Sequence, residues 1–95
     1  MTWADAEGVW AEAACVYYER CYDDDFIYTY GDQEMCQATV LRQRCLDNLR
    51  TYKCDELYPA EREESLQLCS EQMLTLACGS YFAPRSCGDA FQQYE

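Results

Sequence analysis

Apolar residues recur at helical spacing from the start of the chain. Thr2, followed three residues later by Asp5, is a helix N-cap signature. The apolar positions after this cap fall on one face of a helix: Trp3, Ala6, Trp10, Ala14, Tyr17 and Cys21. The pattern predicts a helix from about Trp3 to about Tyr22. Because its three largest aromatic residues are a heptad apart on this face, we expect them to lie in the core rather than to stack on a ligand.

An acidic run and a group of aromatic residues follow this helix. Three consecutive aspartates at residues 23–25 would lie unfavourably at the negatively polarised C-terminal end of a helix. We therefore expect the helix to end before them and residues 23–31 to form a loop. The apolar side chains of this loop predict a short extended segment that packs over the helices: Phe26, Ile27, Tyr28 and Tyr30.

Two further helices are predicted downstream. Asp32 is a plausible N-cap for the second helix. The cations Arg50 and Lys53 lie at its end. Its apolar stripe consists of Ala38, Leu41, Cys45, Leu49 and Tyr52. Pro59 suits the first turn of the third helix, and Gly79 is its natural stop. The acidic residues Glu61, Glu63 and Glu64 lie near its N-terminus. Its apolar face consists of Leu66, Cys69, Met73, Leu76 and Ala77. A turn around Pro84 and a short helix at residues 87–93 complete the chain.

The composition changes this picture by adding covalent cross-links. A chain of 95 residues forms one domain, residues 1–95, and buries a limited core, so it usually needs reinforcement. Eight cysteines without any histidine favour four disulfides over a metal cage: Cys15, Cys21, Cys36, Cys45, Cys54, Cys69, Cys78 and Cys87. We therefore predict an all-α fold, a small disulfide-rich bundle of three to four helices.

The spacing of the cysteines leaves two pairings open. Steps of nine residues join three cysteines in the middle of the chain, and the same steps recur thirty-three residues later. In one pairing Cys21–Cys36 and Cys54–Cys69 clamp the turns between helices, Cys45–Cys78 ties the second and third helices midway, and Cys15 pairs with Cys87. In the other, Cys45–Cys54 and Cys78–Cys87 close nine-residue steps locally, which leaves Cys21–Cys36 and Cys15–Cys69. Both contain Cys21–Cys36.

Disulfides predict an extracellular, periplasmic or cell-envelope location, because these compartments are oxidising. The first fourteen residues carry three acidic side chains where an export signal needs a basic start and an apolar run: Asp5, Glu7 and Glu12. We therefore expect that a leader has been removed ahead of Met1. No segment approaches the roughly 20 apolar residues of a membrane-spanning helix, so we expect no membrane insertion.

The charge and the side-chain inventory narrow the classes of function. A formal net charge of −11 repels nucleic acid and anionic lipid surfaces. Without histidine, only carboxylates, tyrosines and Lys53 remain for acid–base chemistry, so we expect neither an enzyme nor a cofactor. The aspartate run lacks the alternating spacing of a calcium loop, and the cysteines lack the close pairs of a zinc site. Metal or small-ligand handling by cysteines or acidic clusters is the alternative to a binding module.

Tyrosine is the residue type that points to a binding surface. A chain this small cannot bury nine tyrosines, and tyrosine supplies contact area with a polar tip at interfaces. Seven lie off the main apolar stripes: Tyr18, Tyr22, Tyr28, Tyr30, Tyr58, Tyr81 and Tyr94. The candidate partner-binding site is an aromatic patch rimmed by acid: Asp23, Asp24, Asp25, Tyr28 and Tyr30. This patch predicts a protein partner, cationic in character.

The arrangement of these residues also resembles a known group of proteins. The segments that carry the resemblance are Ala14-Cys15, Tyr18-Glu19-Arg20-Cys21, Tyr30-Gly31-Asp32 with Cys36 and Cys45 after it, Cys69, Leu76-Ala77-Cys78, and Pro84 before Cys87. From about residue 14 to about residue 91 the chain resembles small cysteine-rich exported proteins and lipoproteins of myxobacteria and related bacteria. The resemblance implies an envelope or extracellular location and a disulfide-bonded α-helical fold. It implies no activity and no functional residue.

Overall fold

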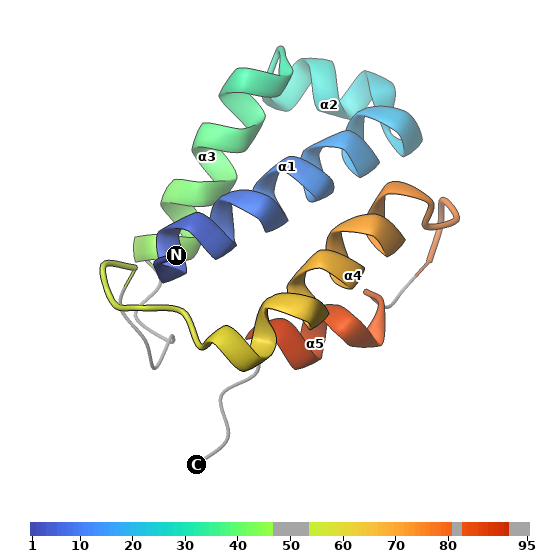
Figure 1. Cartoon of the computed structure of the whole chain (residues 1–95). Helices are drawn as coiled ribbons and strands as arrows, with labels where there is room; N and C mark the ends of the chain where they lie inside the picture. The colour runs from blue at the N-terminus through green and yellow to red at the C-terminus, as the bar shows by residue number, and fades with distance from the viewer. Residues whose placement is uncertain (47–53, 81–82, 92–95) are drawn as a thin grey trace.

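The computed structural model describes residues 1–46, 54–80 and 83–91. In this part of the chain the regular structure is helical, and a single antiparallel bridge joins Thr2 to Leu57. The elements in chain order are α1 (Trp3–Cys21), α2 (Asp23–Thr29), α3 (Gln33–Leu46), the 3₁₀ helix η1 (Ala60–Arg62), α4 (Glu63–Leu74) and α5 (Arg85–Phe91) (Figure 1). The predicted small, disulfide-rich all-α fold is confirmed.

The first helix forms as its cap predicted. The backbone N–H of Thr2 donates to Asp5 Oδ2 (2.9 Å), and the N–H of Asp5 donates back to Thr2 Oγ1 (3.3 Å). This reciprocal capping box satisfies amide groups that the first turn leaves without helical partners. α1 ends at Cys21 with Tyr22 as its C-cap, close to the predicted boundary.

α1 lies at the centre of the bundle, between α3 and α4 (Figure 1). α3 runs antiparallel to it, since Cys15 bonds Cys36 while Glu7, a few residues earlier, pairs with Arg44, a few residues later. α5 packs on α4. The buried side chains form three clusters around α1, and the predicted stripe supplies several of them: Trp3, Ala6, Ala14 and Tyr17 are buried, and Trp10 and Cys21 are partly buried.

The segment predicted as a loop is a helix, so that prediction was wrong. The backbone bends at Tyr22 (φ −137°, ψ 53°), which ends α1 and starts α2. The three aspartates therefore occupy the first turn of a new helix and not the last turn of the old one. Negative charge is favourable at that end, so the aspartates mark the end of α1 as predicted and also the unpredicted start of α2.

The other helix boundaries were predicted in part. Asp32 caps α3 through a hydrogen bond from the N–H of Met35 to its Oδ1 (2.8 Å). α4 ends at Leu74, before the predicted stop at Gly79, because the chain leaves the helix to reach the end of α1. α5 starts at Arg85, two residues before the predicted helix. The predicted positions that lie outside the described residues are Leu49, Arg50, Tyr52, Lys53, Tyr81, Gln93 and Tyr94.

All eight cysteines are paired, as Cys15–Cys36, Cys21–Cys78, Cys45–Cys54 and Cys69–Cys87. Of the predicted bridges only Cys45–Cys54 is present, and the shared Cys21–Cys36 pair was wrong. α2 fills the space that follows α1, so the first turn of α3 meets α1 at Cys15, and Cys21 is left facing the segment after α4. Four disulfides indicate an oxidising compartment outside the cytoplasm.

The N-terminus is fastened to the segment before η1. The N–H groups of Trp3 and Ala4 donate to the carbonyls of Glu56 and Cys54, each at 2.9 Å. Tyr58, predicted to lie off the apolar stripes, is a core residue at 5% exposure, and its ring meets that of Trp3 edge-on. No helix in the described ranges is long and apolar enough to cross a membrane.

Candidate functional site

The short helix α2 turns one face to the core and the other to solvent. Phe26 is 2% exposed and belongs to a buried cluster with Val40 and the Cys15–Cys36 bridge. Successive residues in a helix are rotated by about 100°, so the two residues after Phe26 point away from the core. Ile27 is 56% exposed and Tyr28 is 93% exposed. α2 therefore presents two large apolar side chains to water.

Three carboxylates stand beside these side chains. Asp23, Asp24 and Asp25 are all exposed, and with Cys21 and Tyr22 they line a hollow of about 450 Å³. Among the described residues none of the three carboxylates forms an ion pair or a side-chain hydrogen bond. We call the exposed residues of this region the α2 face: Tyr22, Asp23, Asp24, Asp25, Ile27 and Tyr28. It combines unneutralised negative charge with apolar contact area.

A small cleft opens between the end of α1 and α2. Its volume is about 210 Å³, and we call it the tyrosine cleft; it is lined by Tyr18, Tyr22, Asp25, Phe26, Thr29 and Tyr30. Phe26 forms its inner wall, with the Tyr30 ring 5.8 Å away, centroid to centroid, at 52°. Four aromatic rings and one carboxylate thus surround a space the size of a side chain.

The tyrosine hydroxyls of this cleft lie near one another. Burial raises the pKa of the Tyr18 hydroxyl, and the nearby Tyr30 and Tyr22 hydroxyls raise it further. Burial also raises the pKa of Tyr17, helped by a hydrogen bond with Tyr22, whose ring centroid is 6.0 Å from that of Tyr17. The Tyr17 and Tyr18 phenols therefore stay protonated at neutral pH, and the Tyr17 ring packs edge-on against the ring of Tyr22.

Covalent and polar links fix the frame of the cleft. The Cys21–Cys78 bridge fastens the end of α1 to the segment after α4. Beside it, Arg20 Nη2 donates to the carbonyl of Leu76 at 2.6 Å. On the other side Gln33 Nε2 donates to the carbonyl of Cys15 (3.0 Å) and to Glu19 Oε1 (2.8 Å). These links tie α1, whose end lines the cleft, to α3 and to the segment after α4.

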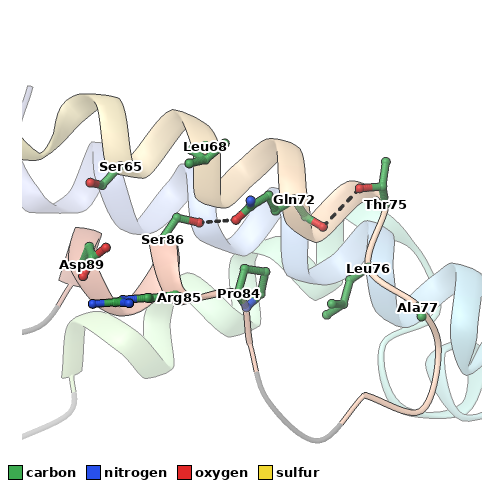
Figure 2. Close-up of a pocket in the computed structure, with 10 residues that line it drawn as sticks. All are labelled: Ser65, Leu68, Gln72, Thr75, Leu76, Ala77, Pro84, Arg85, Ser86 and Asp89. Carbon is green, nitrogen blue, oxygen red and sulfur yellow. Dashed lines mark hydrogen bonds between the residues drawn. The ribbon is translucent and has the colours of Figure 1, made fainter.

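A larger groove of about 590 Å³ runs between α4 and α5. Figure 2 shows its lining, with Leu68 and Gln72 on α4 facing Ser86 on α5. Ser86 Oγ donates to Gln72 Oε1 at 2.7 Å. Arg85 and Asp89 bring opposite charges to the same wall. The buried Ser86 hydroxyl is therefore satisfied by an amide oxygen of the groove's own lining.

A buried ion pair lies in the core and was not predicted. Glu7 is 0% exposed, and Arg44 Nε donates to its Oε2 at 2.5 Å. The Arg44 guanidinium carbon also lies 5.3 Å from the Trp10 ring centroid and 5.1 Å from that of Phe91. The sequence did hold a signal: Glu7 is four residues after Trp3 and three before Trp10, on the apolar face of α1. A carboxylate on such a face requires a buried partner.

The described residues offer no set of metal ligands for the alternative function, metal handling. Every cysteine sulfur is in a disulfide, so none is available as a thiolate ligand. Groups of three or more Cys, Asp or Glu side chains placed to hold an ion are absent from residues 1–46, 54–80 and 83–91. The consecutive aspartates of α2 line a hollow, but they do not converge on one point.

The structure separates the five predicted partner-binding residues into two adjacent groups. Asp25 and Tyr30 line the tyrosine cleft. Asp23, Asp24 and Tyr28 lie outside it on the exposed surface of α2. Sequence analysis missed the contribution of Tyr18, Phe26 and Thr29, because the cleft exists only when α2 is helical and folds back on α1. The chain shows no significant similarity to any protein family, curated protein or solved structure.

Proposed function

We propose that the protein is a binding module of the extracellular space, periplasm or cell envelope, and that it acts by contact rather than as an enzyme. Its partner is a cationic protein segment, and the α2 face is the surface that binds it. The observation that carries the proposal is the 93% exposure of Tyr28 beside three exposed aspartates. The resemblance to small exported cysteine-rich proteins favours the same location.

The α2 face is complementary in charge and in apolar contact area to a cationic protein segment. Tyrosine combines a large apolar ring with a polar tip, and it is enriched among the residues that dominate binding energy at interfaces. The adjacent carboxylates attract a positively charged segment and speed its encounter. The disulfides at both ends of this region reduce the entropy lost on binding, because the surface is already ordered.

Peptide selection on the folded, oxidised protein tests this proposal. We expect random peptides displayed on phage to be enriched in Lys and Arg next to apolar residues. Raising NaCl from about 0.05 M to about 0.3 M should weaken their binding, because salt screens exposed charges. Tyr28→Ala should weaken binding about tenfold. Leu57→Ala, at a residue that is 80% exposed on another surface, is the control and should leave binding unchanged.

A pair of triple variants isolates the effect of charge. Asp23→Asn/Asp24→Asn/Asp25→Asn removes three negative charges from the first turn of α2. Glu61→Gln/Glu63→Gln/Glu64→Gln removes three exposed charges near the start of α4. We expect only the aspartate variant to lose the selected peptides. Equal binding to both variants, or selection of neutral and acidic peptides, would contradict the proposal.

A further inference from the structure

The lining of the tyrosine cleft suits one chemical class of ligand. We propose that the cleft binds an organic ammonium group, with the aromatic rings contacting its alkyl surface and Asp25 as its counter-ion. The inference rests on the proposed function for its setting, since the cationic partner would carry such a group as a lysine side chain. It assigns that group to a particular cavity, which adjoins the α2 face and shares Tyr22 and Asp25 with it.

Electrostatics favours a cation in this cleft. The face of an aromatic ring is electrically negative and attracts cations, and four rings line this space. Asp25 is the one charged group among the six lining residues, and it is an anion. A carboxylate or phosphate ligand would meet Asp25 without a compensating positive charge. A neutral alkyl group would leave Asp25 without a partner.

The size of the cleft favours a side-chain-sized group. Cavities that hold drug-sized ligands are typically about 300 Å³ or larger. The tyrosine cleft has about 210 Å³. If each heavy atom occupies about the volume of one water molecule, about 30 Å³, a group of five heavy atoms needs roughly 150 Å³. A butylammonium or tetramethylammonium group, each of five heavy atoms, therefore fits.

The chemistry of the walls favours ammonium over guanidinium or a metal ion. A guanidinium carries five N–H donors in one plane and is best satisfied by several charged acceptors, whereas this cleft offers one carboxylate. A calcium ion needs six to eight oxygen ligands, more than this lining supplies. An alkylammonium group can place its CH₂ or CH₃ groups on the ring faces and needs one anion close to nitrogen.

Titration of the isotope-labelled, oxidised protein with small ammonium probes, followed by amide NMR shifts, tests the inference. The probes are tetramethylammonium and N-acetyl-lysine methylamide, each compared with an uncharged isostere, tert-butanol or N-acetyl-norleucine methylamide. We expect the cations to shift amides of residues that line the cleft and the isosteres to bind at least about threefold more weakly. The probe that binds more tightly identifies the source, a free quaternary ammonium compound or a lysine side chain.

Matched variants locate the binding. Asp25→Asn should weaken the ammonium probes about threefold, and Tyr30→Leu about fivefold. Asp24→Asn and Tyr28→Leu make the same chemical changes on α2 outside the cleft and should leave the affinity unchanged. Asp25 is exposed, so Asp25→Asn should fold normally even if Tyr30→Leu does not.

Three results would overturn the inference: equal binding of the uncharged isosteres, tighter binding of N-acetyl-arginine methylamide, or shifts confined to other parts of the molecule. The measurements distinguish failure of this inference from failure of the proposed function. If cationic peptides bind the α2 face but leave the amides of Tyr18, Thr29 and Tyr30, which line only the cleft, unshifted, the inference fails and the proposed function stands. If the ammonium probes bind in the cleft but no cationic peptide binds the protein, the proposed function fails and the inference stands.

Discussion

Glu7 is a carboxylate that lies fully buried in the core, where acidic side chains are rarely found. A fully buried carboxylate loses its hydration, and only an opposite charge with good hydrogen-bonding geometry offsets that loss. Arg44 provides the opposite charge, and its guanidinium group also lies over the rings of Trp10 and Phe91. The pair ties α1 to α3, because its two side chains come from these two helices.

Removing Arg44 should therefore cost much more than removing an ordinary surface arginine. We expect Arg44→Met to lower the free energy of unfolding by about 3 kcal/mol, since Glu7 loses its buried counter-charge. The double variant Glu7→Leu/Arg44→Met should recover most of this loss. Chemical denaturation measures both, with Arg42→Met, exposed on the same helix, as the control. A loss below about 1 kcal/mol for Arg44→Met would show that Glu7 does not depend on it.

Tyr58 gives the molecule a pH dependence in the alkaline range. Its buried hydroxyl donates to the carbonyl of Ala90 (2.8 Å), and burial raises its pKa to about 12. In the unfolded chain a tyrosine titrates near about 10. Between these values the unfolded chain releases the proton and the folded chain keeps it, so stability present below pH 10 is lost as the pH rises.

We expect Tyr58 by itself to lower the free energy of unfolding by up to about 1.4 kcal/mol per pH unit between about pH 10 and about pH 12. Tyr17 and Tyr18 add to the decline, because their pKa values are also raised. Tyr58→Phe should make the decline shallower, and it should cost about 1 kcal/mol at neutral pH through the lost hydrogen bond. Short-exposure denaturation curves at each pH provide the measurement, and an unchanged slope in Tyr58→Phe would refute the assignment.

At the scale of the elements, local signals predicted α1 and failed for α2. The Thr2–Asp5 capping box and the apolar stripe after it are contained in the sequence of α1 itself. α2 has seven residues, fewer than an isolated helix needs, so its helicity depends on packing. Phe26 supplies that packing against α1 and α3, and no local pattern around Phe26 reveals such contacts. The aspartate run correctly marked the end of α1, but it did not reveal that a second helix begins after Tyr22.

Phe26 should consequently decide whether α2 forms. Phe26→Ala leaves a cavity and should cost about 3 kcal/mol or more. We expect faster amide hydrogen exchange across residues 23–30 than in α1 or α4, because α2 loses its anchor first. Tyr28→Ala on the same helix removes a 93% exposed ring and should leave exchange unchanged. Uniform acceleration over the whole chain in Phe26→Ala would mean that α2 does not open independently.

At the scale of the whole molecule, the sequence indicated how many disulfides form but not which. One of the two predicted pairings followed the thirty-three-residue repeat and treated the turns after the first and second helices alike. The fold breaks that symmetry, because α2 comes between α1 and α3 in the chain, while in space α1 packs directly between α3 and α4. Cys21 and Cys78 meet across a sequence separation of 57 residues for this reason. The same placement brings Tyr18 beside Tyr30 and so creates the cleft that sequence analysis did not anticipate.

The unequal spans of the bridges predict unequal contributions to stability. In the chain-entropy description, a bridge stabilises by restricting the unfolded chain, and a longer loop restricts it more. Cys45–Cys54 spans 9 residues and Cys21–Cys78 spans 57. Replacing both cysteines of a pair by alanine should cost about 2.6 kcal/mol for the first bridge and about 4 kcal/mol for the second. Denaturation of the two double variants measures the difference.

The two variants should also differ at the tyrosine cleft. Cys21 adjoins Tyr22, so loss of Cys21–Cys78 frees the end of α1 and should weaken the ammonium probes. Cys45–Cys54 lies away from the cleft lining, and its loss should leave their affinity unchanged. If the shorter bridge contributed more stability, contacts in the folded state would outweigh the restriction of the unfolded chain. If probe affinity fell equally in both variants, the cleft would depend on the stability of the whole bundle and not on the bridge beside it.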